Sequence, residues 1–152
     1  MTFKLLCLAA LGLWALNTPA QARLVRSWTG ADLQKTSDLI VIGTPIAVKK
    51  LEEHSALGYG TTFLGIETTF KVCQVLKGHP TGDKIVLHHY AYPMAIGSTG
   101  SLANGPHFIS FEANSTKKYK LYLVKEESGR CAPVSGQVDP CYSVQTVPGS
   151  AN

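Results

Sequence analysis

Histidine and cysteine are the side chains in this sequence that could do chemistry. His88 and His89 are adjacent, and His54, His79 and His107 are scattered along the chain. Imidazole nitrogens bind transition metals and also transfer protons. Neighbouring side chains of a strand point to opposite faces, so His88 and His89 cannot chelate one ion there without a bulge. No HExxH or paired CxxC spacing accompanies them, so we predict no metal site, no cofactor, and histidines that lie at the surface or are hydrogen-bonded internally.

Cys73 could form a nucleophilic pair with a histidine, because such pairs form in space rather than in sequence. It lies inside an expected strand, however, where a structural cysteine is the simpler interpretation. Gly97–Ser101 resembles no nucleophile elbow or phosphate loop, since it lacks both the strand–turn–helix context and a lysine. We therefore predict no catalytic residues. The alternative hypothesis is a small extracytoplasmic enzyme or metal-binding protein that uses His88, His89 or Cys73.

Tyr90, Tyr92 and His107 flank a long glycine-containing connection, Ala91–Gly105. Aromatic side chains at the mouth of a loop can bind ligands, and binding loops are often long and carried by a rigid scaffold. The same residues could simply cover one end of a barrel. We predict that any ligand-binding face lies here. Residues 114–116 (Asn-Ser-Thr) form a glycosylation sequon, which matters in a eukaryotic host.

Residues 1–22 have the features of a cleaved signal peptide. Lys4 gives a basic start, Leu5–Leu16 forms an apolar run of twelve, and Ala20–Ala22 supplies small residues at the cleavage site. Twelve residues are too few to span a bilayer, which requires about twenty. We predict a mature chain that begins at Arg23 and is secreted or periplasmic. An uncleaved N-terminal anchor is the alternative.

The remaining residues, 23–152, suffice for a single domain with one core. Loss of Lys4 leaves 13 basic and 10 acidic residues, a net charge of +3. Lys117–Lys120 is the densest basic cluster, and it is typical of a protected strand edge rather than of a nucleic-acid site. No second apolar run reaches membrane length. We therefore expect an extracytoplasmic protein or glycan as partner, with no nucleic acid and no membrane span.

Three cysteines remain after cleavage, an odd number for an oxidising compartment. Cys131 and Cys141 are the expected disulfide, because prolines and a glycine between them let the chain turn back. Closing a loop of about 11 residues contributes about 3 kcal/mol in the chain-entropy model. Cys73 would then be free and buried as a small apolar group. Bridges from Cys73 to Cys131 or to Cys141 stay open.

The first elements after the signal peptide are a short helix and a long strand. Thr29–Ser37 is expected to be helical, with Thr29 as its N-cap. Leu39–Val48 is apolar and β-branched, which indicates a strand. Pro45 cannot donate a hydrogen bond to a neighbouring strand, so a bulge or an edge is expected at Gly43–Pro45.

The rest of the chain reads as strands separated by turns. Phe70, Val72 and Leu76 are expected on the inner face of the next strand. Several strands with one short N-terminal helix predict a mainly β fold, a small antiparallel barrel. The further expected strands or extended pieces are Thr61–Leu76, Lys84–Tyr90, Pro106–Phe111, Tyr119–Lys125, Cys131–Val134 and Tyr142–Val147.

Short motifs add a resemblance to a known family. Ser37–Gly43 (SDLIVIG), Leu76–Gly78 (LKG), Tyr119–Val124 (YKLYLV) and the turn at Gly129 occur in the order seen in netrin-like domains. The chain thus resembles the oligonucleotide/oligosaccharide-binding (OB) barrel in its tissue-inhibitor-of-metalloproteinase-like form, over Ser37–Val134. The resemblance implies an OB-like barrel, and it bears on fold more than on function.

The inhibitors of that family place a cysteine at the mature N-terminus, where its amine and carbonyl reach the protease zinc. Here the predicted mature end is Arg23, and no cysteine precedes Cys73 in the mature chain. The inhibitory mechanism is therefore assigned to no residue. The expected function is a non-catalytic barrel that binds a protein, a glycan or an envelope component.

Overall fold

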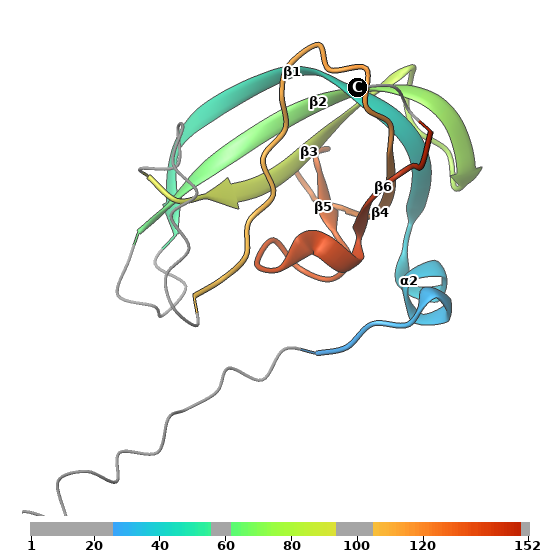
Figure 1. Cartoon of the computed structure of the whole chain (residues 1–152), viewed down its shortest axis with the longest axis horizontal. Coiled ribbons are helices and arrows are strands. Elements are labelled where there is room, and N and C mark those ends of the chain that lie inside the picture. The colour runs from blue at the N-terminus through green and yellow to red at the C-terminus, as the bar shows by residue number, and fades with distance from the viewer. Residues whose placement is uncertain (1–25, 56–61, 94–104, 150–152) are drawn as a thin grey trace, which may run out of the picture.

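In the computed structural model the chain folds into a β-barrel with a short helix at one end (Figure 1). The structure describes residues 26–55, 62–93 and 105–149. The predicted signal peptide, the mature end at Arg23 and most of the Ala91–Gly105 connection lie outside these ranges. The elements are α2 (Gly30–Thr36), β1 (Leu39–Ser55), β2 (Phe63–Lys77), β3 (Lys84–Ala91), β4 (Tyr119–Lys125), β5 (Cys131–Pro133), the 3₁₀ helix η2 (Pro140–Tyr142) and β6 (Val144–Thr146).

The strands form one sheet whose order is β1-β2-β3-β5-β4-β6. Pairing of β1 with β4 closes the first five of these into a barrel, and β6 extends β4. All pairings are antiparallel except the contact of β3 with β5 at Leu87 and Cys131, which is parallel. The prediction of a mainly β barrel with one short helix is confirmed. Among the described residues, no helix is long and apolar enough to cross a membrane.

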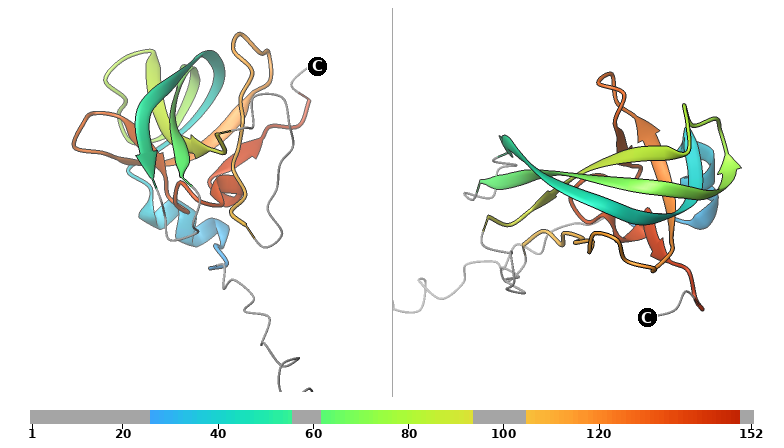
Figure 2. Two further views of the ribbon diagram at one scale, coloured as in Figure 1. Left: turned by 90° about the vertical axis from the view of Figure 1, so that its left-hand side faces the viewer. Right: turned by 90° about the horizontal axis from the view of Figure 1, so that it is seen from above.

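The long strand β1 bends so that it serves two neighbours. It pairs with β2 along its length and with β4 only over Leu39–Gly43. Figure 2 shows β1 and β2 as a long, curved pair. The register with β2 shifts between Ile42 and Gly43 and again between Pro45 and Ala47. These shifts confirm the bulge predicted near Pro45, and bulges of this kind let a strand turn a barrel's corner.

The barrel interior is filled by aliphatic and aromatic side chains. Phe70 is fully buried and packs edge-to-face against Phe111 and Tyr119. Val72 packs against the same core, whereas Leu76 is 44% exposed, so its predicted inward orientation is wrong. Register shifts against β1 break the simple alternation here. The buried residues of this core are Leu39, Val41, Phe70, Ile85, Leu87, Leu121, Leu123, Cys131 and Val144.

Helix α2 packs outside the barrel and is capped at both ends. Thr29 and Asp32 form the capping box that fixes its start: the Asp32 amide donates to the Thr29 hydroxyl, and the Thr29 amide donates to the Asp32 carboxylate. The helix buries Leu33 against Ile40 of β1 and Tyr122 of β4. The predicted helix and its cap are confirmed.

Residues of the motifs behind the family resemblance join the start of β1 to β4 and the end of β2 to α2. The Asp38 carboxylate accepts from the Lys125 amide at 2.9 Å, and the Asp38 amide donates to the Leu123 carbonyl. The Lys77 ammonium donates to the Gln34 carbonyl at 2.6 Å, at the end of α2. Cations favour the C-terminal end of a helix, because its last carbonyls lack partners. These motif residues therefore have a structural task in this chain.

Other predicted pieces differ in detail. The extended piece expected at Pro106–Phe111 is not assigned as a strand, although His107 and Asp139 exchange hydrogen bonds there. The strand expected at Tyr142–Val147 is divided between η2 and β6. Pro140 opens η2 at a position where its missing N–H costs nothing.

The cysteines correct two expectations. Cys131 and Cys141 are free, so the predicted bridge is absent from the structure. The reason is orientation: Cys131 points into the barrel core, whereas Cys141 lies exposed on η2 with its thiol 3.8 Å from the Asp139 carbonyl. Cys73 is free as predicted, but it is exposed rather than buried, because β2 projects beyond its pairing with β3 at this point.

Alkylation of the native protein should separate the three thiols. We expect iodoacetamide to modify Cys73 and Cys141 readily, and Cys131 only after denaturation. Burial raises the pKa of the Cys131 thiol, which lowers the population of the reactive thiolate, and it also blocks access. Mass mapping would contradict this expectation if it found Cys131 linked to Cys141 or alkylated as fast as Cys73.

Candidate functional site

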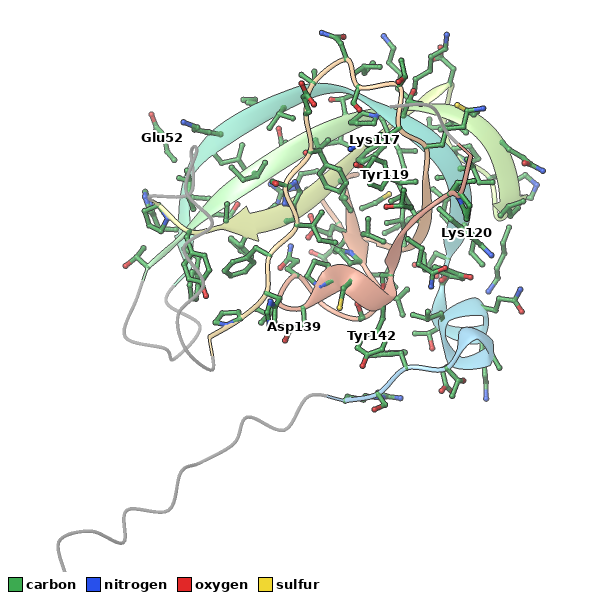
Figure 3. All side chains as sticks on the ribbon, in the orientation of Figure 1. Glu52, Lys117, Tyr119, Lys120, Asp139 and Tyr142 are labelled. Carbon is green, nitrogen blue, oxygen red and sulfur yellow. The ribbon has the colours of Figure 1, made fainter. Side chains whose placement is uncertain are left out.

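The residues predicted to bind a ligand lie in two different parts of the barrel. Tyr92 donates a hydrogen bond to the Pro106 carbonyl at 2.8 Å and packs edge-to-face against two phenylalanines. His107 is exposed next to Pro106, and its amide donates to the carboxylate of Asp139. Figure 3 labels Asp139. Tyr90 instead donates to Glu53 at 2.8 Å. Tyr92 and His107 thus cover one end of the barrel, whereas Tyr90 belongs to a separate polar cluster.

That polar cluster lies on the outer face of β3 and is centred on His88, which is 2% exposed. His88 Nδ1 lies 2.9 Å from a carboxylate oxygen of Glu126 and 2.8 Å from the amide nitrogen of Gln137. His88 Nε2 lies 3.4 Å from Glu53 and has no hydrogen-bond partner among the residues that the structure describes. We call this group the His88 cluster; its members are Glu53, Glu67, His88, Tyr90, Glu126, Arg130 and Gln137.

Arg130 joins the three carboxylates of the cluster. Its guanidinium donates to Glu126 at 3.0 Å and lies within 3.4 Å of Glu67 and 3.6 Å of Glu53. The hydrogen bond from Tyr90 holds the pKa of Glu53 below its usual value, with help from the nearby positive charge of Arg130. Burial, followed by the hydrogen bond to Glu53, raises the pKa of Tyr90 to about 12. These groups are engaged with one another by hydrogen bonds and ion pairs.

His89 lies on the opposite face of β3, inside the barrel. Its Nε2 is 2.9 Å from the hydroxyl of Thr68, and its ring packs edge-to-face on Phe111. Burial lowers the pKa of His89 to about 4, so the ring is neutral near pH 7. His88 and His89 therefore cannot coordinate one ion. Within the described ranges, no three histidine, cysteine or acidic side chains are arranged to hold a metal.

A groove beside α2 is the best candidate for binding. It has a volume of about 480 Å³ and forms where α2 meets β1, the end of β2 and the start of β4. Figure 3 places Lys120 on the α2 side of the barrel. We call it the lysine groove; its lining residues are Ala31, Gln34, Lys35, Ile40, Leu76, Lys77 and Lys120.

The lysine groove combines three ammonium groups with an apolar floor. Lys77 is fixed by its hydrogen bonds to the carbonyls of Gln34 and Lys35, and Lys120 lies 4.9 Å from the centre of the Tyr122 ring. Leu76 contributes exposed apolar surface. Among the described residues that line the groove, none carries a carboxylate. The groove therefore offers positive charge beside apolar surface, which suits an anionic ligand with an apolar part.

Sequence reasoning missed this groove because its residues come from four segments. The available signals were the basic cluster Lys117–Lys120 and the Leu76–Gly78 motif, which were interpreted as a strand edge and a turn. Their proximity depends on the closure of the barrel by the β1–β4 pairing.

No protein-family model matches this chain, and no curated protein matches it in sequence. The geometry described above is therefore the basis for assigning a function.

Proposed function

We propose that the chain is a secreted or periplasmic, non-catalytic OB-like barrel that binds another extracytoplasmic protein through the lysine groove. The signal-peptide features of residues 1–22 support the location. The order of the family motifs supports the OB-like assignment. The observation that carries the proposal is the lysine groove itself, whose lining, over the part of the chain that the structure describes, has three lysines and no acidic residue.

The contacts and burial of the candidate reactive side chains favour a binding function over catalysis. His88 is engaged by Glu126 and Gln137, and His89 is neutral and faces Thr68 inside the barrel. The Cys73 thiol lies on the outside, 3.9 Å from the Lys71 carbonyl. A catalytic imidazole needs a substrate within hydrogen-bond reach, and burial denies that access to both histidines.

The expected occupant is a protein segment in which acidic and apolar side chains alternate. Its carboxylates would meet Lys35 and Lys120, and an apolar side chain would cover Leu76. Charged contacts at exposed positions contribute only about 0.2–1 kcal/mol each, so the apolar contact must add affinity. Binding should weaken as salt rises, because the lysines are solvated.

The test is fluorescence anisotropy with a labelled ten-residue peptide of alternating glutamate and leucine. We expect the native protein to bind it, and the double variant K35E/K120E to bind about tenfold or more weakly, because two attractions become repulsions. Lys77 stays unchanged, since it caps α2. The control is K50E/K84E, which makes the same change in net charge at exposed lysines away from the groove.

Equal loss of binding in the control would show that only net charge matters and would overturn the groove assignment. A heparin fragment and phosphatidylglycerol vesicles serve as the comparison probes. Groove-dependent binding of either probe, without binding of the peptide, would contradict a protein ligand.

A further inference from the structure

Two side chains lie within hydrogen-bond distance of the same ring nitrogen of His88. Nδ1 lies 2.9 Å from Glu126 Oε1 and 2.8 Å from Gln137 Nε2. A ring nitrogen has a single in-plane position, which holds either a hydrogen or a lone pair. A carboxylate can only accept and an amide N–H₂ can only donate, so the proton on Nδ1 decides which partner is bound.

The two partners belong to different parts of the chain. Glu126 follows β4 in the turn to β5, where its other carboxylate oxygen accepts from Arg130. Gln137 lies in the segment between β5 and η2. Gln137 Nε2 also lies 3.3 Å from Glu126 Oε1 and 3.5 Å from the His88 carbonyl, so the amide has alternative acceptors when it leaves Nδ1.

The surrounding charges suit both states of the ring. Glu53 of β1 faces Nε2 at 3.4 Å, Glu67 lies opposite on β2, and Arg130 lies beyond the carboxylates. Tyr90 packs against the His88 ring with 5.3 Å between ring centres, and His89 lies on the other face of the strand. A neutral ring with its hydrogen on Nε2 faces Glu53 and leaves Nδ1 free to accept. A protonated ring presents an N–H to each of two carboxylates.

We propose that His88 is a proton-operated switch between the β4–β5 turn and the segment that carries Gln137. With one proton, on Nε2, the ring accepts a hydrogen bond from the Gln137 amide, and Glu126 stays paired with Arg130. With a second proton, on Nδ1, it donates to Glu126 and releases the Gln137 amide. Falling pH therefore transfers the His88 contact from the Gln137 segment to the β4–β5 turn.

Nitrogen-15 NMR of the histidine ring tests the switch, because a nitrogen with a lone pair is distinguishable from one with a hydrogen. We expect Nδ1 of His88 in the native protein to change from the state with a lone pair to the state with a hydrogen as pH falls. The side-chain amide signals of Gln137 should shift with the same midpoint. Q137L removes the donor that favours the neutral ring and should raise that midpoint, whereas E126Q removes the negative acceptor and should lower it. Each shift should be about half a pH unit to one pH unit.

Matched controls are E127Q, an exposed neighbour of Glu126, and Q145L, an exposed glutamine on β6. Both should leave the midpoint unchanged. Backbone amide shifts of the core strands show which variants stay folded, and Q137L keeps the proposal testable if E126Q loosens the turn. Midpoints that move in the same direction in Q137L and E126Q, or a ring whose Nδ1 keeps one state from pH 5 to pH 9, would overturn the switch.

Discussion

Replacing Gly78 with alanine should lower the free energy of unfolding by about 3 kcal/mol or more. Gly78 has a φ of +79°, which side chains rarely adopt, and a Cβ built there would collide with the Asp38 carbonyl oxygen. Left-handed backbone costs alanine about 1–2 kcal/mol, and forced overpacking adds about 1–3 kcal/mol. Asp38 cannot yield easily, because its amide and its carboxylate both bind the chain at β4. Urea denaturation of G78A and the native protein measures the difference.

Gly129 supplies the matched control. Its φ is +84°, and a Cβ there would meet no atom of the described ranges within 4 Å. G129A should therefore cost only the backbone strain, about 1–2 kcal/mol. Equal losses in G78A and G129A would show that Gly78 is required only for its backbone conformation, and that the close approach to Asp38 has no role.

Acid should destabilise the fold by way of His89. Burial lowers the pKa of His89 to about 4 in the folded protein, whereas an unfolded histidine titrates near pH 6.5. The neutral ring thus contributes stability that is complete above about pH 6.5 and is lost as pH falls toward about 4. The loss in free energy of unfolding should reach about 3 kcal/mol at pH 4, because His89 binds a proton more tightly in the unfolded chain than in the folded one.

The variant H89Q isolates this contribution, since glutamine fills the site without titrating. Its free energy of unfolding should fall by about 3 kcal/mol less than that of the native protein between pH 7 and pH 4. H107Q, at an exposed histidine, should follow the native curve. Parallel pH curves for H89Q and the native protein would refute the buried, neutral assignment.

Local patterns predicted the elements well, and they did so for physical reasons. The capping residue Thr29, the proline in β1 and the alternation in β4 each act within a few residues of themselves. The predicted inward orientation of Leu76 was wrong, because the direction of its side chain depends on register shifts against the partner strand β1. The Cys131–Cys141 bridge failed for a similar reason: turn residues allow the chain to reverse, but packing decides where a thiol points.

Candidate sites were harder to predict than elements. The sequence singled out His88, His89 and Tyr90, yet not the Glu126, Arg130 and Gln137 side chains that surround His88. The parallel contact of β3 with β5 places those side chains beside His88, and no local pattern indicates this contact. The lysine groove likewise exists only after α2, β1, β2 and β4 have met.

The central claim is that this barrel binds a protein through the lysine groove, and NMR mapping tests it most directly. The glutamate–leucine peptide is titrated into the nitrogen-15-labelled protein while the backbone amide signals are followed. Our account predicts the largest shifts at Ala31, Gln34, Ile40 and Leu76, with β3 unaffected. Shifts concentrated instead around Tyr92 and His107, with no change along the groove, would contradict it.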